Sequence, residues 1–465
     1  MDIMDMTYGH NGHNELIEHG KKLSKEAKDT DWMKATSSRK HEHDEWNAYE
    51  MICYHLQTEP QHLTRLIANY YSKPEVLPDF VKKALLPLFN FVADEREEFL
   101  LASLLKMILK RDIDTLTQPM ALRKTNAAKF TRIILPMVTG IESLQSKIVE
   151  LCKQLRLKEN QIEFFNLNID SIFEAYEGRR PKDSREAAQN DKVAHVLNSS
   201  KAFLTKWGSK VAEVLFSKST KLPKMLQFLI NSTYIDMKER FPRATHADIM
   251  QGIAGWIYKS FWEQMVTTEI KHDDGSADDD LNKRTAISRF VEFGVINVGY
   301  GDDKWYLSSL NEAISSINEL AMQLLTPVIA EEEEIYHQHK YCDVLGKRKP
   351  ILHISLPQLN VLHRYAKTNI EEMIPKEEDR LRVLIVETQP PNADQELYVT
   401  LLLHPMPIVD QSQKDPQQLF ERTKRYLIEC LLCGCPGENV RILLENPTLE
   451  REEQKYKELP QSEEN

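Results

Sequence analysis

Glycine is scarce in this chain, and that scarcity restricts the folds available to it. Only 15 of the 465 residues are glycine, whereas about 7% is usual in globular proteins. Tight turns depend on glycine because it adopts positive φ angles without steric cost. Many-stranded folds joined by tight turns, such as sandwiches and propellers, are therefore disfavoured. Hydrophobic residues make up 41% of the chain, which is enough for a sizeable core, and roughly 150 residues per domain would allow two to four domains.

Apolar side chains at helical spacing dominate the chain between residues 46 and 373. In residues 91–110, leucines and an isoleucine repeat at this spacing behind Asp94, a candidate N-cap, and Glu97 lies at the capping-box position. A second helix is expected over residues 222–240 and ends before Pro242, which cannot continue it. A third is expected to begin near Thr245. Apolar faces on successive helices predict a mainly α fold, with helix packed on helix.

The pattern changes after residue 349. Residues 351–354 form a short extended run, and Ser355 is expected to cap a new helix, with Gln358 at the capping-box position. A polar, proline-containing linker then precedes a candidate strand at 397–403, and a last helix is expected to start near Asp415. We therefore expect a small α/β domain after the helical one. The division of the chain is a disordered acidic and His-rich tail at 1–45, a helical domain at 46–385 and a partial C-terminal domain at 386–465.

Composition and charge exclude several functional classes. No apolar run reaches 18 residues, so no membrane span is expected. The acidic N-terminal segment lacks the pattern of a secretory signal, and six cysteines do not make a disulfide framework in so long a chain. The net charge of −11 argues against extensive nucleic-acid binding. These features predict a cytoplasmic protein that does not bind nucleic acid.

Several groups of potential ligands fall short of a metal or nucleotide site. Cys430, Cys433 and Cys435 form a C-x-x-C-x-C pattern, but a closed zinc site needs a fourth ligand. The acidic residues of 273–280 lack the glycine and glutamate positions of a calcium-binding EF-hand loop. Histidines in the N-terminal tail and glycines near residue 300 match no metal or phosphate motif either: His10, His13, His19, His41, His43, Gly294, Gly299 and Gly301. No metal and no cofactor are therefore expected.

Four stretches resemble one protein family, and they occur in the family's order. Residues 88–110 read LFNFVADEREEFLLASLLKMILK, and residues 222–261 read LPKMLQFLINSTYIDMKERFPRATHADIMQGIAGWIYKSF. Residues 349–355 read KPILHIS, and residues 423–456 read TKRYLIECLLCGCPGENVRILLENPTLEREEQKY. Together they resemble the RasGAP superfamily, and most closely the GAP-related region and RasGAP C-terminal domain of IQGAP-type scaffold proteins. The resemblance implies an elongated, all-helical domain with a groove that grips a small GTPase.

In active members of this family, an arginine finger enters the GTPase and stabilises charge on the transferring phosphoryl group. The segment most similar to the finger loop is 121–126, ALRKTN. The resemblance places Arg123 at the finger position, although IQGAP relatives commonly lack this arginine. Arg132 is the alternative finger if the alignment is shifted by several residues. The neighbouring residues expected to contact the GTPase are Leu122, Lys124, Thr125 and Asn126.

The family's second motif is eroded in residues 257–264, IYKSFWEQ. Ser260 would replace the arginine that steadies the finger loop, while Glu263 and Gln264 would replace an Asn-Pro pair. A serine cannot supply the several hydrogen bonds of a guanidinium group. Lys259, Ser260 and Glu263 are expected to lie on the GTPase-binding surface.

The resemblance implies a regulator of a small GTPase, of Ras or Rho type, that stimulates GTP hydrolysis weakly or not at all. Such a chain is a regulator of a GTPase and not an enzyme in its own right. The alternative is a cytoskeletal or signalling scaffold that no longer engages a GTPase. The expected location is the cytoplasm, including the cell cortex or cytoskeleton. The calponin-homology, WW and IQ portions of a full IQGAP are not seen in the sequence, so neither calmodulin nor direct actin binding is implied.

Overall fold

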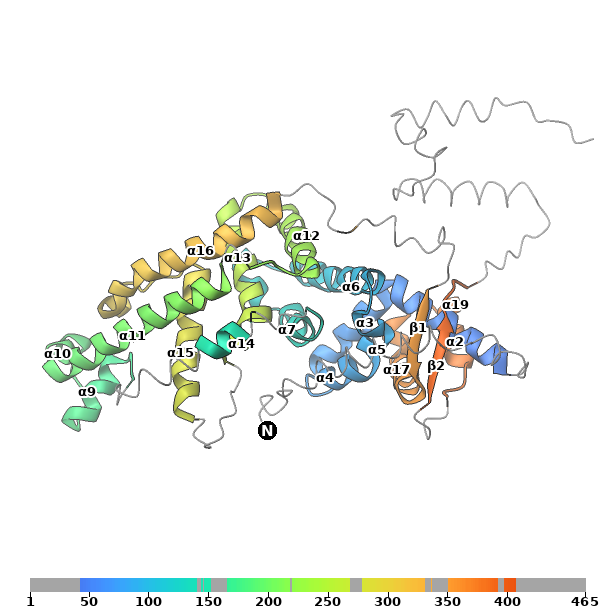
Figure 1. Cartoon of the computed structure of the whole chain (residues 1–465), viewed down its shortest axis with the longest axis horizontal. Helices are drawn as coiled ribbons and strands as arrows, with labels where there is room; N and C mark the ends of the chain where they lie inside the picture. The colour runs from blue at the N-terminus through green and yellow to red at the C-terminus, as the bar shows by residue number, and fades with distance from the viewer. Residues whose placement is uncertain are drawn as a thin grey trace, which may run out of the picture.

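The computed structural model describes residues 42–139, 144, 146–151, 165–217, 220–267, 278–330, 336, 350–391 and 397–406. These residues form an elongated, mainly helical molecule with one two-stranded sheet (Figure 1). The predicted fold class, mainly α with a small part that contains strands, is confirmed. None of the described helices combines the length and hydropathy needed to cross a bilayer.

The elements follow in chain order. The first part of the chain comprises α2 (Glu42–Thr58), α3 (Pro60–Asn69), η3 (Tyr70–Ser72), α4 (Leu77–Phe80), η4 (Val81–Leu85), α5 (Leu86–Leu88), η5 (Asn90–Val92), α6 (Glu95–Ile113), η6 (Pro119–Lys124) and α7 (Asn126–Val138). The middle comprises α9 (Ile169–Glu177), α10 (Ser184–Ala188), α11 (Asp191–Leu215), α12 (Lys224–Arg240), α13 (His246–Ile257), η7 (Tyr258–Trp262) and α14 (Glu263–Thr267). The last part comprises α15 (Asp278–Val295), η8 (Asp302–Leu310), α16 (Asn311–Ala330), β1 (Ile351–Ser355), α17 (Leu356–Thr368), α18 (Ile370–Met373), α19 (Arg380–Glu387) and β2 (Tyr398–Leu402).

The chain runs from one end of the molecule to the other and back. It starts beside the sheet with α2, reaches α9 and α10 at the opposite end, and returns to the sheet with α17 and α19 (Figure 1). Strands β1 and β2 pair antiparallel, with Ile351 opposite Leu402 and Ser355 opposite Tyr398. Helix α2 packs on β2 and α19, and the backbone N–H of Leu402 donates to the Glu50 carboxylate at 3.0 Å. The first and last described elements therefore share one end of the fold.

The division of the chain at residue 386 stays a prediction. Strand β1 lies before that position and β2 after it, so the sheet joins the two sides. Domain boundaries usually fall where few contacts cross. The described residues on both sides of position 386 therefore pack as one unit around the sheet.

Local capping signals set the helix starts that the sequence predicted. The Asp94 side chain accepts from the backbone N–H groups of Arg96 and Glu97. The Ser355 and Gln358 capping box forms at the start of α17, and a second one, Thr245 with Asp248, begins α13. Both expected strands are also confirmed.

Two details of the predicted helices differ from the structure. Helix α6 begins at Glu95 and not at residue 91, because residues Asn90, Phe91 and Val92 adopt positive φ angles of 48°, 51° and 60°. This left-handed turn cannot continue into a right-handed helix. In addition, the Glu97 carboxyl hydrogen-bonds to the Asp94 side chain, where the capping box would direct it to the Asp94 backbone.

The core runs along the whole described length of the molecule. Its largest fully buried side chains include Trp207, Trp256 and Trp262. The Trp262 ring meets Phe216 edge-on, with the ring centroids 4.9 Å apart. Such contacts between α11 and η7 hold the middle of the molecule together.

Some predictions fall outside the described residues. They are residues 1–41 of the N-terminal tail, the acidic segment before Asp278, the helix expected from Asp415, the cysteine group at 430–435 and the motif at 423–456. Residues 42–45, which the prediction assigned to the tail, form the start of α2. Within the described part of the chain, no group of three or more potential ligand residues could hold a metal ion.

Candidate functional site

The segment that carries the candidate finger is a short turn seated on a helix. Arg123 lies in η6, which packs along α13. This packing requires glycine in α13. A Cβ atom on Gly252 would stand 2.6 Å from the backbone oxygen of Pro119, and one on Gly255 would stand 2.8 Å from Ile296 Cγ2. Gly252 therefore lets η6 approach the helix backbone, and Gly255 makes room for Ile296, the residue that follows α15.

The end of the turn is fixed by the start of α7. The Thr125 side chain accepts from the backbone N–H of Ala128 and caps the helix. Asp112, at the end of α6, accepts from the backbone N–H of Ala127 with an N–O distance of 2.7 Å. Two oxygen atoms thus satisfy N–H groups in the first turn of α7, which would otherwise lack partners. The backbone around Arg123 is held on both sides.

Arg123 points at a carboxylate of α15. Its guanidinium donates from NH1 to Glu292 Oε1 at 2.9 Å. Only 21% of the Arg123 side chain and 10% of the Glu292 side chain are exposed. The Nε of Arg123 is buried without a hydrogen-bond partner. The guanidinium is therefore directed into the molecule, toward α15.

Glu292 begins a chain of alternating charges. Lys259 of η7 lies 2.8 Å from Glu292 Oε2 and also pairs with Glu263 of α14. Glu263 in turn lies 3.2 Å from NH2 of Arg132, which belongs to α7. We call this set, Arg123, Glu292, Lys259, Glu263 and Arg132, the ion-pair chain. It holds three cations and two anions, and its Arg132 end is open to solvent with 45% of the side chain exposed.

Ser260 lies beneath this surface. Its side chain is fully buried, and its hydroxyl donates to the Ala128 carbonyl at 3.2 Å. The Thr131 hydroxyl donates to Ser260 Oγ at 2.9 Å and accepts from Trp256 Nε1 at 3.1 Å. These three side chains join α7 to α13 and η7. Ser260 is a buried link between helices.

The residues that the sequence assigned to GTPase binding differ in how far they are buried. Leu122 and Ser260 are fully buried, so neither presents a surface to a partner. Lys124 and Asn126 are exposed, and Thr125 is half-buried as the cap of α7. Lys259, and not Ser260, is the residue of the eroded motif whose side chain meets the partner of Arg123. The assignment of these residues to GTPase binding stays a prediction.

Sequence reasoning missed the glutamate that connects the site. Glu292 lies 169 positions after Arg123 in the chain. One signal pointed to it, because it is a carboxylate inside the apolar run Phe290-Val291-Glu292-Phe293, and such a residue is seldom buried without a charged partner. The glycines of α13 also left a signal, the spacing G-x-x-G at Gly252 and Gly255.

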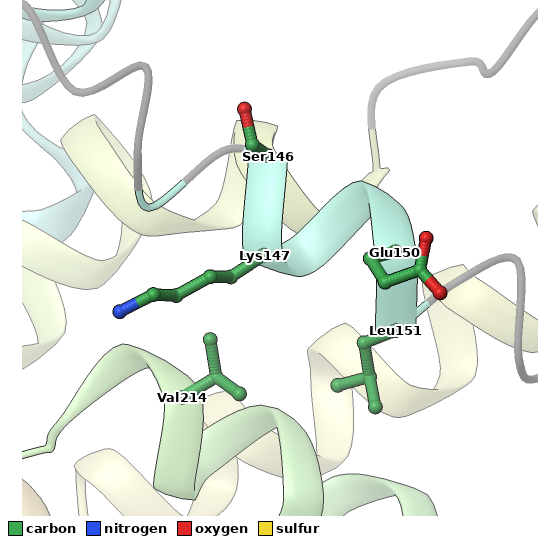
Figure 2. A pocket seen from close by; sticks show the side chains of 5 residues that line it. All are labelled: Ser146, Lys147, Glu150, Leu151 and Val214. Carbon is green, nitrogen blue, oxygen red and sulfur yellow. The ribbon is translucent and has the colours of Figure 1, made fainter.

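A shallow hollow lies elsewhere on the molecule and does not alter this assignment. It has a volume of about 390 Å³ and is lined by Ser146, Lys147, Glu150, Leu151 and Val214. Figure 2 shows the first four on one helical segment beside Val214 of α11. None of these residues belongs to the ion-pair chain. An open hollow of this kind lacks the converging polar groups of a ligand site.

The buried hydroxyl of Thr131 yields a test of how the site is supported. Replacing Thr131 with valine keeps the shape but leaves Trp256 Nε1 without an acceptor. We expect the free energy of unfolding to fall by about 1–3 kcal/mol, the cost of an unsatisfied buried donor. Urea unfolding followed by tryptophan fluorescence measures this change. Thr131→Ser keeps the hydroxyl and should recover most of the loss, whereas equal losses in both variants would contradict this account.

Comparison with known proteins supports the resemblance read from the motifs. Residues 61–264 match the family described as GTPase-activator protein for Ras-like GTPase. The chain is 21% identical to the Ras GTPase-activating-like protein IQGAP2 of Homo sapiens over 94% of its own length. It is 22% identical to the Ras GTPase-activating-like protein rgaA of Dictyostelium discoideum over 83% of its length.

The chain spans only part of these relatives. It covers 31% of the human protein and 50% of the Dictyostelium one. The matched region, 61–264, includes Arg123 of η6, Arg132 of α7, Lys259 of η7 and Glu263 of α14, which are all the members of the ion-pair chain except Glu292. Residues 61–264 therefore form a RasGAP domain, and the chain is similar to IQGAP-type proteins over most of its length.

Proposed function

We propose that this chain binds a small GTPase of the Ras superfamily, of Ras or Rho type, and stimulates GTP hydrolysis weakly or not at all. The observation that carries the proposal is the place of Arg123. It lies within the matched residues 61–264, in the segment that the resemblance aligns with the finger loop, and its guanidinium is paired with a buried carboxylate. The chain thus has an arginine in this segment, but the ion pair with Glu292 restrains its guanidinium.

Local charge supports binding of an anionic partner surface. Arg123, Lys124, Lys129 and Arg132 all lie on η6 and α7, and the last three are exposed. A GTPase carries its nucleotide phosphates near the surface that a GAP approaches. Cations clustered on one face favour such an encounter even though the whole chain carries a net charge of −11. In such a complex the nucleotide would be bound by the GTPase and not by this chain.

Magnitudes favour weak stimulation. An arginine finger raises hydrolysis about 10³–10⁵-fold, which corresponds to roughly 4–7 kcal/mol. Breaking a buried ion pair costs about 3–5 kcal/mol when one charge is left alone. Lys259 would remain on Glu292 and lower this cost, so withdrawing Arg123 from Glu292 would offset part of the finger's contribution. If Ser260 stands where the family has its second arginine, the finger loop also lacks that brace.

The test is a hydrolysis and binding assay over a panel of GTP-loaded Ras- and Rho-type GTPases. We expect measurable binding, with stimulation below about 100-fold, and we expect Arg123→Ala to abolish whatever stimulation is seen. Arg180→Ala is the matched control, since that arginine is 86% exposed on a remote segment. Strong stimulation that survives in Arg123→Ala would show that another residue, with Arg132 as the first candidate, is the finger.

The second candidate function is a scaffold that has lost GTPase engagement. Glu263 favours it, because a carboxylate in the candidate site is unfavourable beside nucleotide phosphates. Under this function, no GTPase in either nucleotide state would bind in the same assay. A cytoskeletal or signalling protein would then be the partner to seek.

A further inference from the structure

The chain of charges around Arg123 carries an inference about how the site is regulated. Glu292 touches two cations from separate parts of the fold, with Arg123 at 2.9 Å on one oxygen and Lys259 at 2.8 Å on the other. We propose that Glu292 is a positioning residue that holds the Arg123 guanidinium inside the molecule, which we call the stowed state. We also propose that Lys259 is the counter-ion of Glu292 when the guanidinium swings out to the surface, which we call the released state. The stowed state is inferred from the ion pairs alone. Its effect on a GTPase depends on the proposed function.

The stowed state follows from burial and direction. The Arg123 side chain is four-fifths covered, and its guanidinium faces α15. The Nε of the same residue is buried without a hydrogen-bond partner, so the group is held with one of its donors unsatisfied. An unsatisfied buried donor raises the free energy of the stowed state and brings it closer to that of the released state.

The released state depends on Lys259. When Arg123 swings out, Glu292 would be a buried carboxylate, which is costly if nothing else neutralises it. Lys259 already contacts its second oxygen and would remain there. Lys259 in turn stays close to Glu263, so the rest of the ion-pair chain need not move. Because Glu292 contacts two cations, Lys259 still neutralises it after Arg123 is released, and the free-energy cost of release is lower.

Two substitutions separate these roles. Glu292→Gln removes the charge that holds Arg123 and should expose the guanidinium. Lys259→Met leaves Arg123 as the remaining cation on Glu292 and should hold it more tightly. The two variants are therefore expected to change the accessibility of Arg123 in opposite directions, which general loosening of the fold would not do.

Accessibility can be measured without any GTPase. Purified chain is treated with phenylglyoxal, which modifies arginine side chains, and modification of each arginine is followed by mass spectrometry of peptides. Arg180, at 86% exposed, is the internal reference. We expect Arg123 to react on the order of tenfold more slowly than Arg180 in the wild type, severalfold faster in Glu292→Gln and severalfold more slowly in Lys259→Met.

Glu186→Gln is the matched control. It breaks a remote ion pair, in which Arg179 lies 2.6 Å from Glu186, and should leave the reactivity of Arg123 unchanged. Unchanged Arg123 reactivity in Glu292→Gln, or faster reaction in Lys259→Met, would overturn the proposal. If Glu292→Gln does not fold, Lys259→Met decides alone, because only the stowed arrangement predicts slower reaction.

The hydrolysis assay then tests whether release of Arg123 from Glu292 affects a GTPase. Glu292→Gln is expected to increase stimulation by a responsive GTPase about tenfold, and Glu292→Gln with Arg123→Ala should lose that gain. Faster phenylglyoxal reaction without any gain in hydrolysis would support the stowed geometry and count against Arg123 as the finger, whereas absence of binding to every GTPase in the panel would count against the proposed function. Failure of the stowed state and failure of the proposed function therefore give different results.

Discussion

Replacing Glu97 with glutamine is expected to stabilise the protein at neutral and alkaline pH. The Glu97 side chain is almost fully buried in α6, and burial together with the neighbouring Asp94 carboxyl raises its pKa to about 9. One of its oxygen atoms, Oε2, is buried without a hydrogen-bond partner. The protonated form is therefore the one that the fold accommodates.

The sign of the pH dependence follows from linkage. The folded state keeps a proton on Glu97 that the unfolded chain releases above its ordinary pKa of 4.5. This group's contribution to stability is thus fully present below pH 4.5 and is lost progressively as the pH rises toward 9. Each pKa unit corresponds to about 1.4 kcal/mol, and pH 7.5 lies about three units above the ordinary pKa, so the loss there is on the order of 4 kcal/mol.

Glu97→Gln removes this dependence, because its amide can still donate to Asp94 and carries no charge. We expect the variant and the wild type to be about equally stable at pH 4.5, and the variant to be more stable by about 4 kcal/mol at pH 7.5. Urea unfolding at both pH values measures the difference. Glu213→Gln, at an exposed position of α11, is the matched control. A variant less stable than the wild type at pH 7.5 would contradict the buried, protonated state.

Local signals allowed much of the fold to be predicted from the sequence. Helix starts at Asp94, Thr245 and Ser355 depend on side chains within three residues of the helix, so the sequence contains the whole cause. The non-helical turn that precedes this cap was not predicted, because Asn90–Val92 have positive φ angles that such residues seldom adopt. No local preference predicts that turn, which packing must impose.

The candidate site was harder to predict, and η7 shows why. Residues Tyr258–Trp262 form a π-helical turn, which inserts extra chain into the helix and rotates the side chains that follow. Regular helical spacing therefore could not tell that Ser260 faces inward and Lys259 outward. The pairing of Arg123 with Glu292 joins two helices far apart in the chain. Only the tertiary fold brings these residues together.

Replacing Gly252 with alanine is expected to displace the turn that carries Arg123. In the middle of an ordinary exposed helix, this change would stabilise the protein by about 0.5–1 kcal/mol. Here the new Cβ atom would lie 2.6 Å from the Pro119 oxygen and 2.9 Å from its carbonyl carbon. Both are backbone atoms, so no side chain can rotate to make room. Overpacking of this kind costs about 1–3 kcal/mol, which outweighs the gain in helix propensity.

The matched control is Gly255→Ala in the same helix. Its Cβ atom would meet Ile296 Cγ2, the end of a branched side chain, at 2.8 Å and the Cδ of Arg123 at 3.4 Å. A side chain can shift where a backbone cannot, so Gly255→Ala should cost less than Gly252→Ala. We expect Gly252→Ala to lower the free energy of unfolding by about 1–2 kcal/mol after the helix gain is included, and to speed the reaction of Arg123 with phenylglyoxal. If Gly252→Ala raised stability instead, η6 would not be held against α13 by this close backbone contact, and the position of Arg123 would need another cause.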